Sequence, residues 1–380
     1  MQISDITTIA TAGGHANWLF VKVETDAGIT GWGEASLENR ETSVQTEIAE
    51  LGEGLRGRDP MQIEKIWVDV HRGAFWSGGA VSMSALSGID QALWDIKGKA
   101  LGVPVYELLG GKVRDRLRTY ANSWFEIGAD PQGYARDALA MVELGFDALK
   151  WDPFTGATQM LSREVEETAF ENIAAVRDAV GPDVDLCIEA HGRFNVVSAV
   201  RVGQRLEEFN PFFYEEPILH DNPDAMAEVA RAVRVPIACG ERLLSRWDFR
   251  PLLERNCVRI IQPDICHAGG ISELKKIATM AETYYVGVQP HNAGGPLSTL
   301  SSIHLDASTP NFAIQEFFEP YRERYNQLLT HPIEIDRGQL VVPDRPGLGA
   351  DIDESAAAAL PPDPALALRR VVNSPNFPYL

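Results

Sequence analysis

Between residues 117 and 316, short apolar runs alternate with segments of helical periodicity, and this pattern restricts the fold more than any other feature. Apolar runs separated by helix-length segments are typical of βα units, whose strands lie parallel. The candidate strands are residues 117–121, 148–151, 184–189, 212–215, 237–240, 260–263, 287–289 and 313–316. Eight strands with seven intervening helical segments predict an α/β fold with a TIM-type barrel.

The flanking parts of the chain follow other patterns. Apolar and polar residues alternate over 3–10, 18–25 and 29–35, which predicts an antiparallel meander. Helical periodicity follows over 43–55, 61–70 and 82–101, so we expect a separate α+β domain here. Beyond residue 320 the pattern gives way to Pro, Ala and Asp. We expect this last segment to pack back on the first domain.

The charge balance excludes some classes of partner. The chain has 54 acidic and 34 basic residues, a net charge of −20, which argues against nucleic acid and anionic membranes as partners. It does not exclude a small anionic substrate, because a bound cation can override the global field. The four cysteines form no C-x-x-C pair, and no apolar run reaches about 18 residues. We therefore expect a cytoplasmic protein that acts on a small molecule.

Chemically active side chains stand at the ends of the later candidate strands. They recur every 23 to 27 residues, which is the length of one βα unit: Glu189, Glu215, Glu241, Asp264, His291 and Glu316. The active site of a barrel enzyme lies at the carboxyl ends of its strands. We therefore expect these side chains to meet at one mouth of the barrel.

Three of these residues predict a metal site. Glu189, Glu215 and Glu241 come from three adjacent strands, and converging carboxylates repel one another unless a cation neutralises them. Oxygen ligands of this kind suit Mg²⁺. Salt bridges to Lys150, Arg193 or Arg242 are the structural alternative, and a zinc site fits the ligand types less well.

Two histidines predict acid–base chemistry beside that site. His191 is two residues beyond a candidate ligand, and His291 ends a strand almost opposite. Asp264 ends the strand before that of His291, and an Asp–His pair fixes the imidazole tautomer and raises its basicity. One base and one acid on opposite sides of a bound substrate would result. The roles of His15 and His267 stay open.

Six strings carry a resemblance that spans almost the whole chain. They are the segment 84–95, Glu189-Ala190-His191-Gly192-Arg193, Glu215-Glu216-Pro217, Gly240-Glu241-Arg242, Gln262-Pro263-Asp264 and Pro290-His291-Asn292. The chain resembles the mandelate-racemase-like subgroup of the enolase superfamily, and within it the sugar-acid dehydratases of the galactonate/gluconate type. The resemblance implies a capping domain with lid loops (1–116), a modified (β/α)7β barrel (117–318), and a C-terminal segment (319–380) completing the capping domain. It also implies one Mg²⁺ on Glu215 rather than Glu216, and a homo-oligomer.

With this resemblance we expect an acid-sugar dehydratase, a carbon–oxygen lyase that forms a 2-keto-3-deoxy acid. His291, oriented by Asp264, would abstract the C2 proton, and His191 would protonate the departing 3-hydroxyl. A protonated Glu316 would donate a hydrogen bond to the enediolate, and Lys150 would pair with the substrate carboxylate. The expected substrate contacts are Arg193, Trp76, His15 and Trp151.

Three departures from the family pattern bear on this expectation. Glu189 stands where the subgroup usually has Asp, and Ala293-Gly294-Gly295-Pro296 replaces the usual residues after the His-Asn motif. The paired-lysine motif reads Lys150-Trp151-Asp152, so the second lysine is absent and a racemase using it is disfavoured. The alternative function is that of a racemase, epimerase or cycloisomerase that acts on a carboxylate substrate. A catalytically dead barrel would predict a broken ligand or base, and none is seen.

Overall fold

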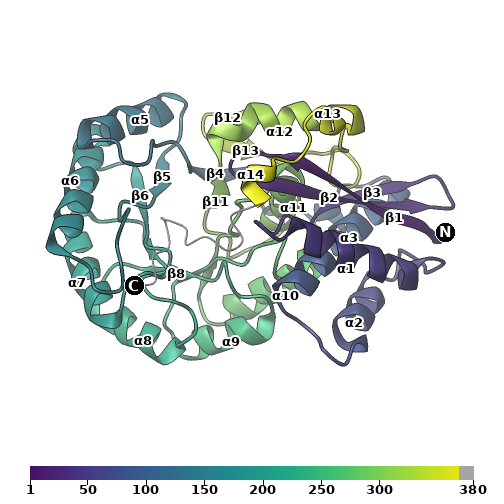
Figure 1. Cartoon of the computed structure of the whole chain (residues 1–380), viewed down its shortest axis with the longest axis horizontal. Helices are drawn as coiled ribbons and strands as arrows, with labels where there is room; N and C mark the ends of the chain where they lie inside the picture. Colours follow the sequence, from purple (N-terminus) through teal and green to yellow (C-terminus); the bar gives the residue numbers. More distant parts are fainter. Residues whose placement is uncertain (368–380) are drawn as a thin grey trace.

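The computed structural model describes residues 1–367 of the chain, and most of them belong to a barrel. Its strands are β4 (Arg116–Ala121), β5 (Ala148–Trp151), β6 (Asp185–Glu189), β7 (Phe213–Glu215), β8 (Ile237–Cys239), β9 (Ile260–Ile261), β10 (Gly287–Val288) and β11 (Gln315–Phe317). The helices between them are α5 (Pro131–Glu143), α6 (Arg163–Val180), α7 (Val196–Leu206) with η1 (Glu207–Phe209), α8 (Pro223–Ala232), α9 (Arg246–Glu254), α10 (Gly270–Glu282) and α11 (Pro296–Ala307). In Figure 1, α5 to α9 follow one another around the outside of the strands.

The strand order closes the barrel. Strands β4 to β10 pair with their neighbours in chain order, all parallel. The last strand, β11, pairs with β4, and the segment just before β11 reaches β10 through a parallel bridge between Val288 and Phe312. The predicted (β/α)7β arrangement is therefore confirmed, with strand boundaries that differ from the expected ones by a few residues.

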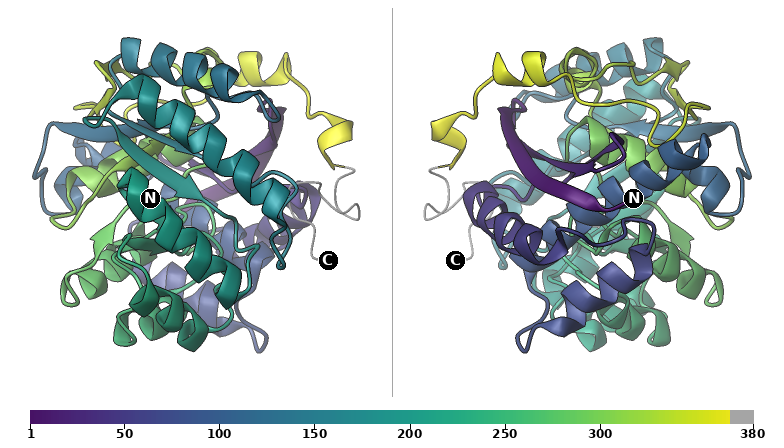
Figure 2. Two further views of the ribbon diagram at one scale, coloured as in Figure 1. Left: turned by 90° about the vertical axis from the view of Figure 1, so that its left-hand side faces the viewer. Right: turned by 90° about the vertical axis from the view of Figure 1, so that its right-hand side faces the viewer.

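The first domain is built on the predicted meander. Strands β1 (Ile3–Ala12), β2 (Asn17–Thr25) and β3 (Thr30–Glu34) form an antiparallel sheet, covered by α1 (Glu41–Leu55), α2 (Ile63–Gly73) and α3 (Ala80–Leu101). Helix α3 ends at Gly102, whose φ of 71° is the left-handed conformation that glycine adopts without strain. The short α4 (Val105–Leu108) leads to the barrel. Figure 2 shows this domain from two sides, with the strands of the sheet lying beside α1.

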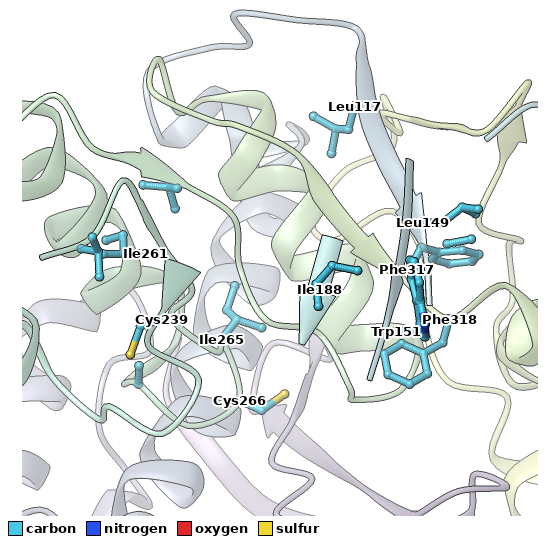
Figure 3. Close-up of a cluster of buried hydrophobic side chains, with 14 of the residues drawn as sticks. Leu117, Leu149, Trp151, Ile188, Cys239, Ile261, Ile265, Cys266, Phe317 and Phe318 are labelled. Atoms are coloured by element: carbon cyan, nitrogen blue, oxygen red, sulfur yellow. The ribbon is translucent and has the colours of Figure 1, made fainter. Parts of the chain in front are cut away.

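The alternation along each barrel strand divides the apolar side chains into two layers. A small inner cluster contains Tyr120, Ala148, Cys187, Phe213, Ala238, Ile260 and Ile314. The residues next to them in sequence, such as Leu149 and Ile188, belong to the large cluster between strands and helices, part of which Figure 3 shows. Side chains two residues beyond the inner cluster therefore continue along the inner face toward the mouth of the barrel.

Helix α3 joins the two domains through buried polar contacts. Ser87 Oγ accepts a hydrogen bond from Gly269 N (2.8 Å), and the Asp90 carboxylate accepts from both N and Oγ of Ser272 (3.0 and 2.5 Å). These partners lie on the loop after β9 and at the start of α10. The loop that follows Asp264 is therefore fixed to the first domain by side chains of α3, together with Trp67 of α2, whose Nε1 donates to the Gly269 carbonyl (2.9 Å).

The C-terminal segment contacts both domains. It contains η2 (Glu319–Tyr321), α12 (Arg322–Leu328), β12 (Ile335–Asp336), β13 (Gln339–Val341), α13 (Glu354–Ala358) and α14 (Pro364–Ala367). Strand β13 pairs antiparallel with β4 of the barrel, and the Leu360 carbonyl accepts hydrogen bonds from Ala12 N and Thr11 Oγ1 of β1. The rest of the predicted segment, residues 368–380, lies outside the described residues.

No helix within residues 1–367 combines the length and the apolar character needed to cross a membrane.

One buried histidine makes the stability of this fold sensitive to acid. Burial lowers the pKa of His304 on α11 to about 4, from 6.5. Above pH 6.5 the ring is neutral in both states, but between pH 6.5 and 4 the unfolded chain binds the proton first, so stability falls by about 3 kcal/mol. We expect His304→Gln to lose less stability over this range in urea titrations. The exposed control His331→Gln should follow the wild type, and parallel curves for all three proteins would contradict the prediction.

Candidate active site

A cavity of about 530 Å³ opens at the carboxyl ends of the barrel strands. Its floor carries Lys150, Glu189, Glu241, Asp264 and His291 from the barrel. The first domain completes the wall with residues from the loops around His15, Ser36–Glu38 and Ala80. The expected residues at the strand ends therefore meet at one mouth, where the first domain narrows the entrance.

The alternation of the strands brings these side chains together. On β5 the inner residue Ala148 is followed at two-residue steps by Lys150 and Asp152, and on β6 Cys187 is followed by Glu189 and His191. The two strands pair in register, with Lys150 opposite Cys187. Each inner strand face thus ends in a short series of polar side chains that enter the cavity.

Three carboxylates lie close enough to hold one cation. Glu189, Glu215 and Glu241 each offer an oxygen, and these oxygens lie within 4.8 Å of one another. The Oε2 atoms of Glu189 and Glu215 are buried without a hydrogen-bond donor, although a buried carboxylate oxygen without such a donor is costly. A cation, Lys150 Nζ, lies 3.4 Å from Glu189 Oε2. Burial and the nearby Glu189 charge raise the pKa of Glu215 well above its usual range. These donors fit a hard divalent cation that prefers oxygen ligands.

Two cationic side chains contact the carboxylate triad but do not neutralise its charge. Lys150 Nζ lies 2.7 Å from Glu215 Oε1 and 3.4 Å from Glu189 Oε2, and Arg242 Nε lies 3.5 Å from Glu241 Oε1. Burial opposes the charge on Lys150, but Glu215 and Glu316 hold its pKa well above the ordinary value. Lys150 is only 4% exposed and already binds these carboxylates. The salt-bridge alternative is thus partly correct for Lys150 and Arg242, but carboxylates outnumber these cations.

One histidine–aspartate pair lies on the side of β9 and β10. His291 Nδ1 is 2.7 Å from Asp264 Oδ2, and Nε2 of the ring lies 3.6 Å from Glu241 Oε2. Burial disfavours the charged imidazole, but Glu241 and Asp264 outweigh it and raise the pKa of His291 well above 6.5. A divalent cation held by Glu241 would offset the charge of this carboxylate and so favour the neutral ring that a base requires. The pairing expected for Asp264 and His291 is present, with Nε2 directed toward the triad.

A second pair, which the sequence interpretation missed, lies on the side of β5 and β6. His191 Nδ1 is 2.6 Å from Asp152 Oδ2, and Arg193 binds both carboxylate oxygens of Asp152 at 2.9 and 2.5 Å. Burial lowers the pKa of His191, but Glu189 and Asp152 reverse this and raise it. Asp152 could have been found from the alternation, because it is two residues beyond Lys150 on the inner face.

Glu316, expected as a hydrogen-bond donor to the enediolate, is held in the structure by two asparagines. Its Oε2 accepts a hydrogen bond from Asn292 N (2.7 Å), and its Oε1 accepts one from Asn122 Nδ2 (2.7 Å). Burial raises the pKa of Glu316, but Lys150 and His291 outweigh burial and lower it. Both oxygens accept hydrogen bonds here and the lowered pKa favours the ionised form, so the donation of a hydrogen bond by Glu316 to the enediolate stays a prediction.

The four expected substrate contacts divide into two groups. His15 and Trp151 line the cavity, and His15 Nε2 is hydrogen bonded to the Ala293 carbonyl at 2.8 Å. Arg193 is buried behind the wall with its guanidinium on Asp152. Trp76 is 87% exposed on the loop between α2 and α3, with its ring against Phe75. Direct substrate contact by these last two residues does not fit their positions in this structure.

Two further contacts connect the first domain to the catalytic loops. His267 lines the cavity with Nδ1 2.9 Å from Ser84 Oγ of α3, and its Nε2 lies 3.9 Å from Asp264 Oδ1. Glu34 of β3 accepts hydrogen bonds from Gly295 N (2.5 Å) and Ser298 N (2.9 Å) at the start of α11.

The contact between Glu34 and Gly295 explains why glycine stands at position 295, within the segment 293–296 that departs from the family pattern. A Cβ on Gly295 would lie 2.9 Å from the Trp18 ring and 3.0 Å from the carboxylate oxygens of Glu34. Glycine is therefore required where the first domain approaches the loop after His291.

Comparison with known proteins agrees with this architecture. Residues 2–110 match the mandelate racemase/muconate lactonizing enzyme N-terminal domain, and residues 133–356 match the enolase C-terminal domain-like family. A solved member of the enolase superfamily from Salmonella Typhimurium superposes with a TM-score of 0.90 and 37% identity, covering 95% of this chain and 98% of that one.

Curated relatives cover nearly the whole chain as well. A D-galactonate dehydratase of Xanthomonas oryzae pv. oryzae is 41% identical over 378 residues, 96% of either chain. One of Ralstonia pickettii is 42% identical over 368 residues, 93% of either chain. The prediction of an enzyme of the carbon–oxygen lyase class is confirmed by these relatives. The chain belongs to the mandelate racemase/muconate lactonizing enzyme family of the enolase superfamily.

Proposed function

We propose that this enzyme dehydrates a sugar acid, an aldonate such as galactonate or gluconate, to a 2-keto-3-deoxy acid with Mg²⁺ as its cofactor. The observation that carries the proposal is the pair of imidazole–carboxylate dyads on either side of a carboxylate triad. The names of the relatives agree with a reaction of this type. Mg²⁺ held by Glu189, Glu215 and Glu241 would stabilise the negative charge that develops on the substrate carboxylate.

The residues of the chain supply the proton transfers. His291 takes the C2 proton at Nε2, while Asp264 holds its Nδ1 and stabilises the imidazolium. The electrons of the broken C2–H bond pass into the carboxylate and then form the C2=C3 bond. The C3–O bond breaks as His191 delivers a proton to the oxygen, which leaves as water. The enol tautomerises to the 2-keto product.

The main alternative uses the same first step. A racemase or epimerase would return a proton to C2, and a cycloisomerase would form a ring. Two imidazoles facing one cavity are compatible with proton return from the second face. Incubation with substrate in D₂O separates these outcomes, because only dehydration yields a keto acid.

We expect the purified enzyme with Mg²⁺ to convert at least one aldonate or related acid sugar to a product that reacts with semicarbazide. A panel of mono- and diacid sugars, followed by NMR, would identify the substrate. Deuterium at C2 without a keto product would favour racemisation or epimerisation. No change in any member of the panel would contradict the proposed function.

Three broader assignments rest on the sequence and stay predictions. The protein is proposed to be cytoplasmic and to form a homo-oligomer. Its proposed divisions are the capping domain (1–116), the barrel (117–318) and the C-terminal segment (319–380). Sedimentation velocity of the full chain would test the oligomer.

A further inference from the structure

We propose that Asp152 is the positioning residue for the catalytic acid, and that it acts only on the second half of the reaction, the loss of the hydroxyl group. The inference rests on the proposed function and deepens it. Asp152 would orient His191 so that the protonated Nε2 faces the leaving oxygen. It would leave proton removal at C2, on the other side of the cavity, nearly unaffected.

The hydrogen bonds around Asp152 fix the position of its carboxylate. Arg193 donates to both oxygens, and both side chains are largely buried, with exposures of 13% for Asp152 and 3% for Arg193. A bidentate guanidinium–carboxylate pair allows one relative orientation of its two planes. The Oδ2 atom that Arg193 holds is also the atom that lies 2.6 Å from His191 Nδ1. Asp152 is therefore a fixed acceptor for the imidazole.

The backbone conformation of His191 helps to determine where the second ring nitrogen, Nε2, lies. Its φ of 49° is in the left-handed region, which is unusual for a residue with a Cβ. Arg242 Nη2 donates to the His191 carbonyl (3.1 Å), and the next residue, Gly192, donates its N–H to the Glu216 carbonyl (2.7 Å). With the backbone held in this way, rotation of the side chain is the remaining freedom, and the bond to Asp152 fixes it. Because Nδ1 is held by this bond, the proposal assigns the proton transfer to Nε2 of the ring.

The two dyads are separated across the barrel. Asp152 and His191 follow β5 and β6, whereas Asp264 and His291 follow β9 and β10, with β7 and β8 between them in the sheet. Each aspartate serves the histidine of the neighbouring strand. A change at Asp152 should therefore act on one proton transfer and a change at Asp264 on the other.

The test compares Asp152→Asn with Asp264→Asn in the Mg²⁺-loaded enzyme and a substrate identified for the wild type. Two rates are measured in D₂O by NMR: deuterium entry at C2 of recovered substrate and formation of the keto acid. For Asp152→Asn we expect keto-acid formation to fall by about 10²-fold or more while exchange at C2 persists within a few-fold. For Asp264→Asn we expect both rates to fall together.

The control variant is Asp147→Asn, which makes the same chemical change just before the same strand. Asp147 is 56% exposed and pairs with Arg118, away from the cavity, so both rates should equal those of the wild type. Asp152→Glu, which keeps the charge, should recover part of the keto-acid rate.

Three outcomes would overturn the inference. Keto-acid formation at the wild-type rate in Asp152→Asn would remove any role for Asp152. Equal loss of exchange and keto-acid formation in that variant, with unchanged circular dichroism, would make Asp152 part of substrate or metal binding. If the wild type itself gives neither reaction with any acid sugar, the proposed function fails and the inference fails with it.

Discussion

Replacement of His291 by asparagine is expected to lower kcat by about 10²- to 10⁴-fold, and to abolish deuterium entry at C2. Asparagine retains a polar side chain that can still approach Asp264, but it cannot accept a proton near neutral pH. Because His291 Nε2 faces the carboxylate triad 3.6 Å from Glu241, its loss should affect the first chemical step rather than substrate affinity. Steady-state kinetics and NMR exchange on the same samples would measure both effects.

A matched control is His71→Asn on α2, where the ring stacks on Trp247 away from the cavity. His71→Asn should keep the wild-type kcat and the wild-type rate of deuterium entry at C2. Exchange at C2 that continues at the wild-type rate in His291→Asn would show that another group is the base, and the roles of the two dyads would have to be exchanged.

Replacement of Glu215 by glutamine is expected to remove both activity and metal binding. The carboxylate lies at the centre of the triad and is fully buried, and an amide oxygen is a weaker, uncharged ligand. In the wild type, Mg²⁺ should raise the melting temperature, because a cation that binds only the folded state stabilises it by mass action. Differential scanning calorimetry with and without Mg²⁺ should detect this shift, and the shift should be absent in Glu215→Gln.

Glu216→Gln is the adjacent control. Glu216 is equally buried and pairs with Arg242, but it lies outside the triad, so the Mg²⁺-dependent shift should remain. Chelation of the wild type followed by dialysis should remove activity, and added Mg²⁺ should restore it. Full activity after chelation would contradict the metal assignment for all three glutamates.

The sequence predicted the features that follow from repetition. The 23–27-residue spacing from Glu189 to Glu316 reflects one βα unit per strand, so the sequence alone predicts that these side chains lie at one mouth of the barrel. The prediction of the carboxylate triad depended on the same reasoning, because adjacent parallel strands bring their carboxyl ends together. Strand alternation could also have identified Asp152, since it continues the inner series of β5.

Contacts that depend on long-range packing could not be predicted in this way. Arg193 follows a strand end and is cationic, which suggested a contact with an anionic substrate, but the structure directs it to Asp152. The two hydrogen bonds that Glu316 accepts come from Asn122 and Asn292, which approach from two other loops. The bond between Ser84 and His267 joins residues 183 positions apart, and no local pattern marks it.

The buried contacts of α3 have a consequence for how this fold can be recombined. The helix belongs in sequence to the first domain, but its serine and aspartate side chains hold the loop that follows Asp264. A chimera that joined residues 1–110 of one relative to the barrel of another would therefore alter the support of the general base as well as the entrance of the cavity. A graft that preserves catalysis should therefore carry Glu34 and Trp67 as well as α3 with the barrel, because Glu34 accepts hydrogen bonds from the loop after His291 and Trp67 donates to the Gly269 carbonyl. The support of the catalytic loops thus reaches back to β3, well upstream of the border between the two folded domains.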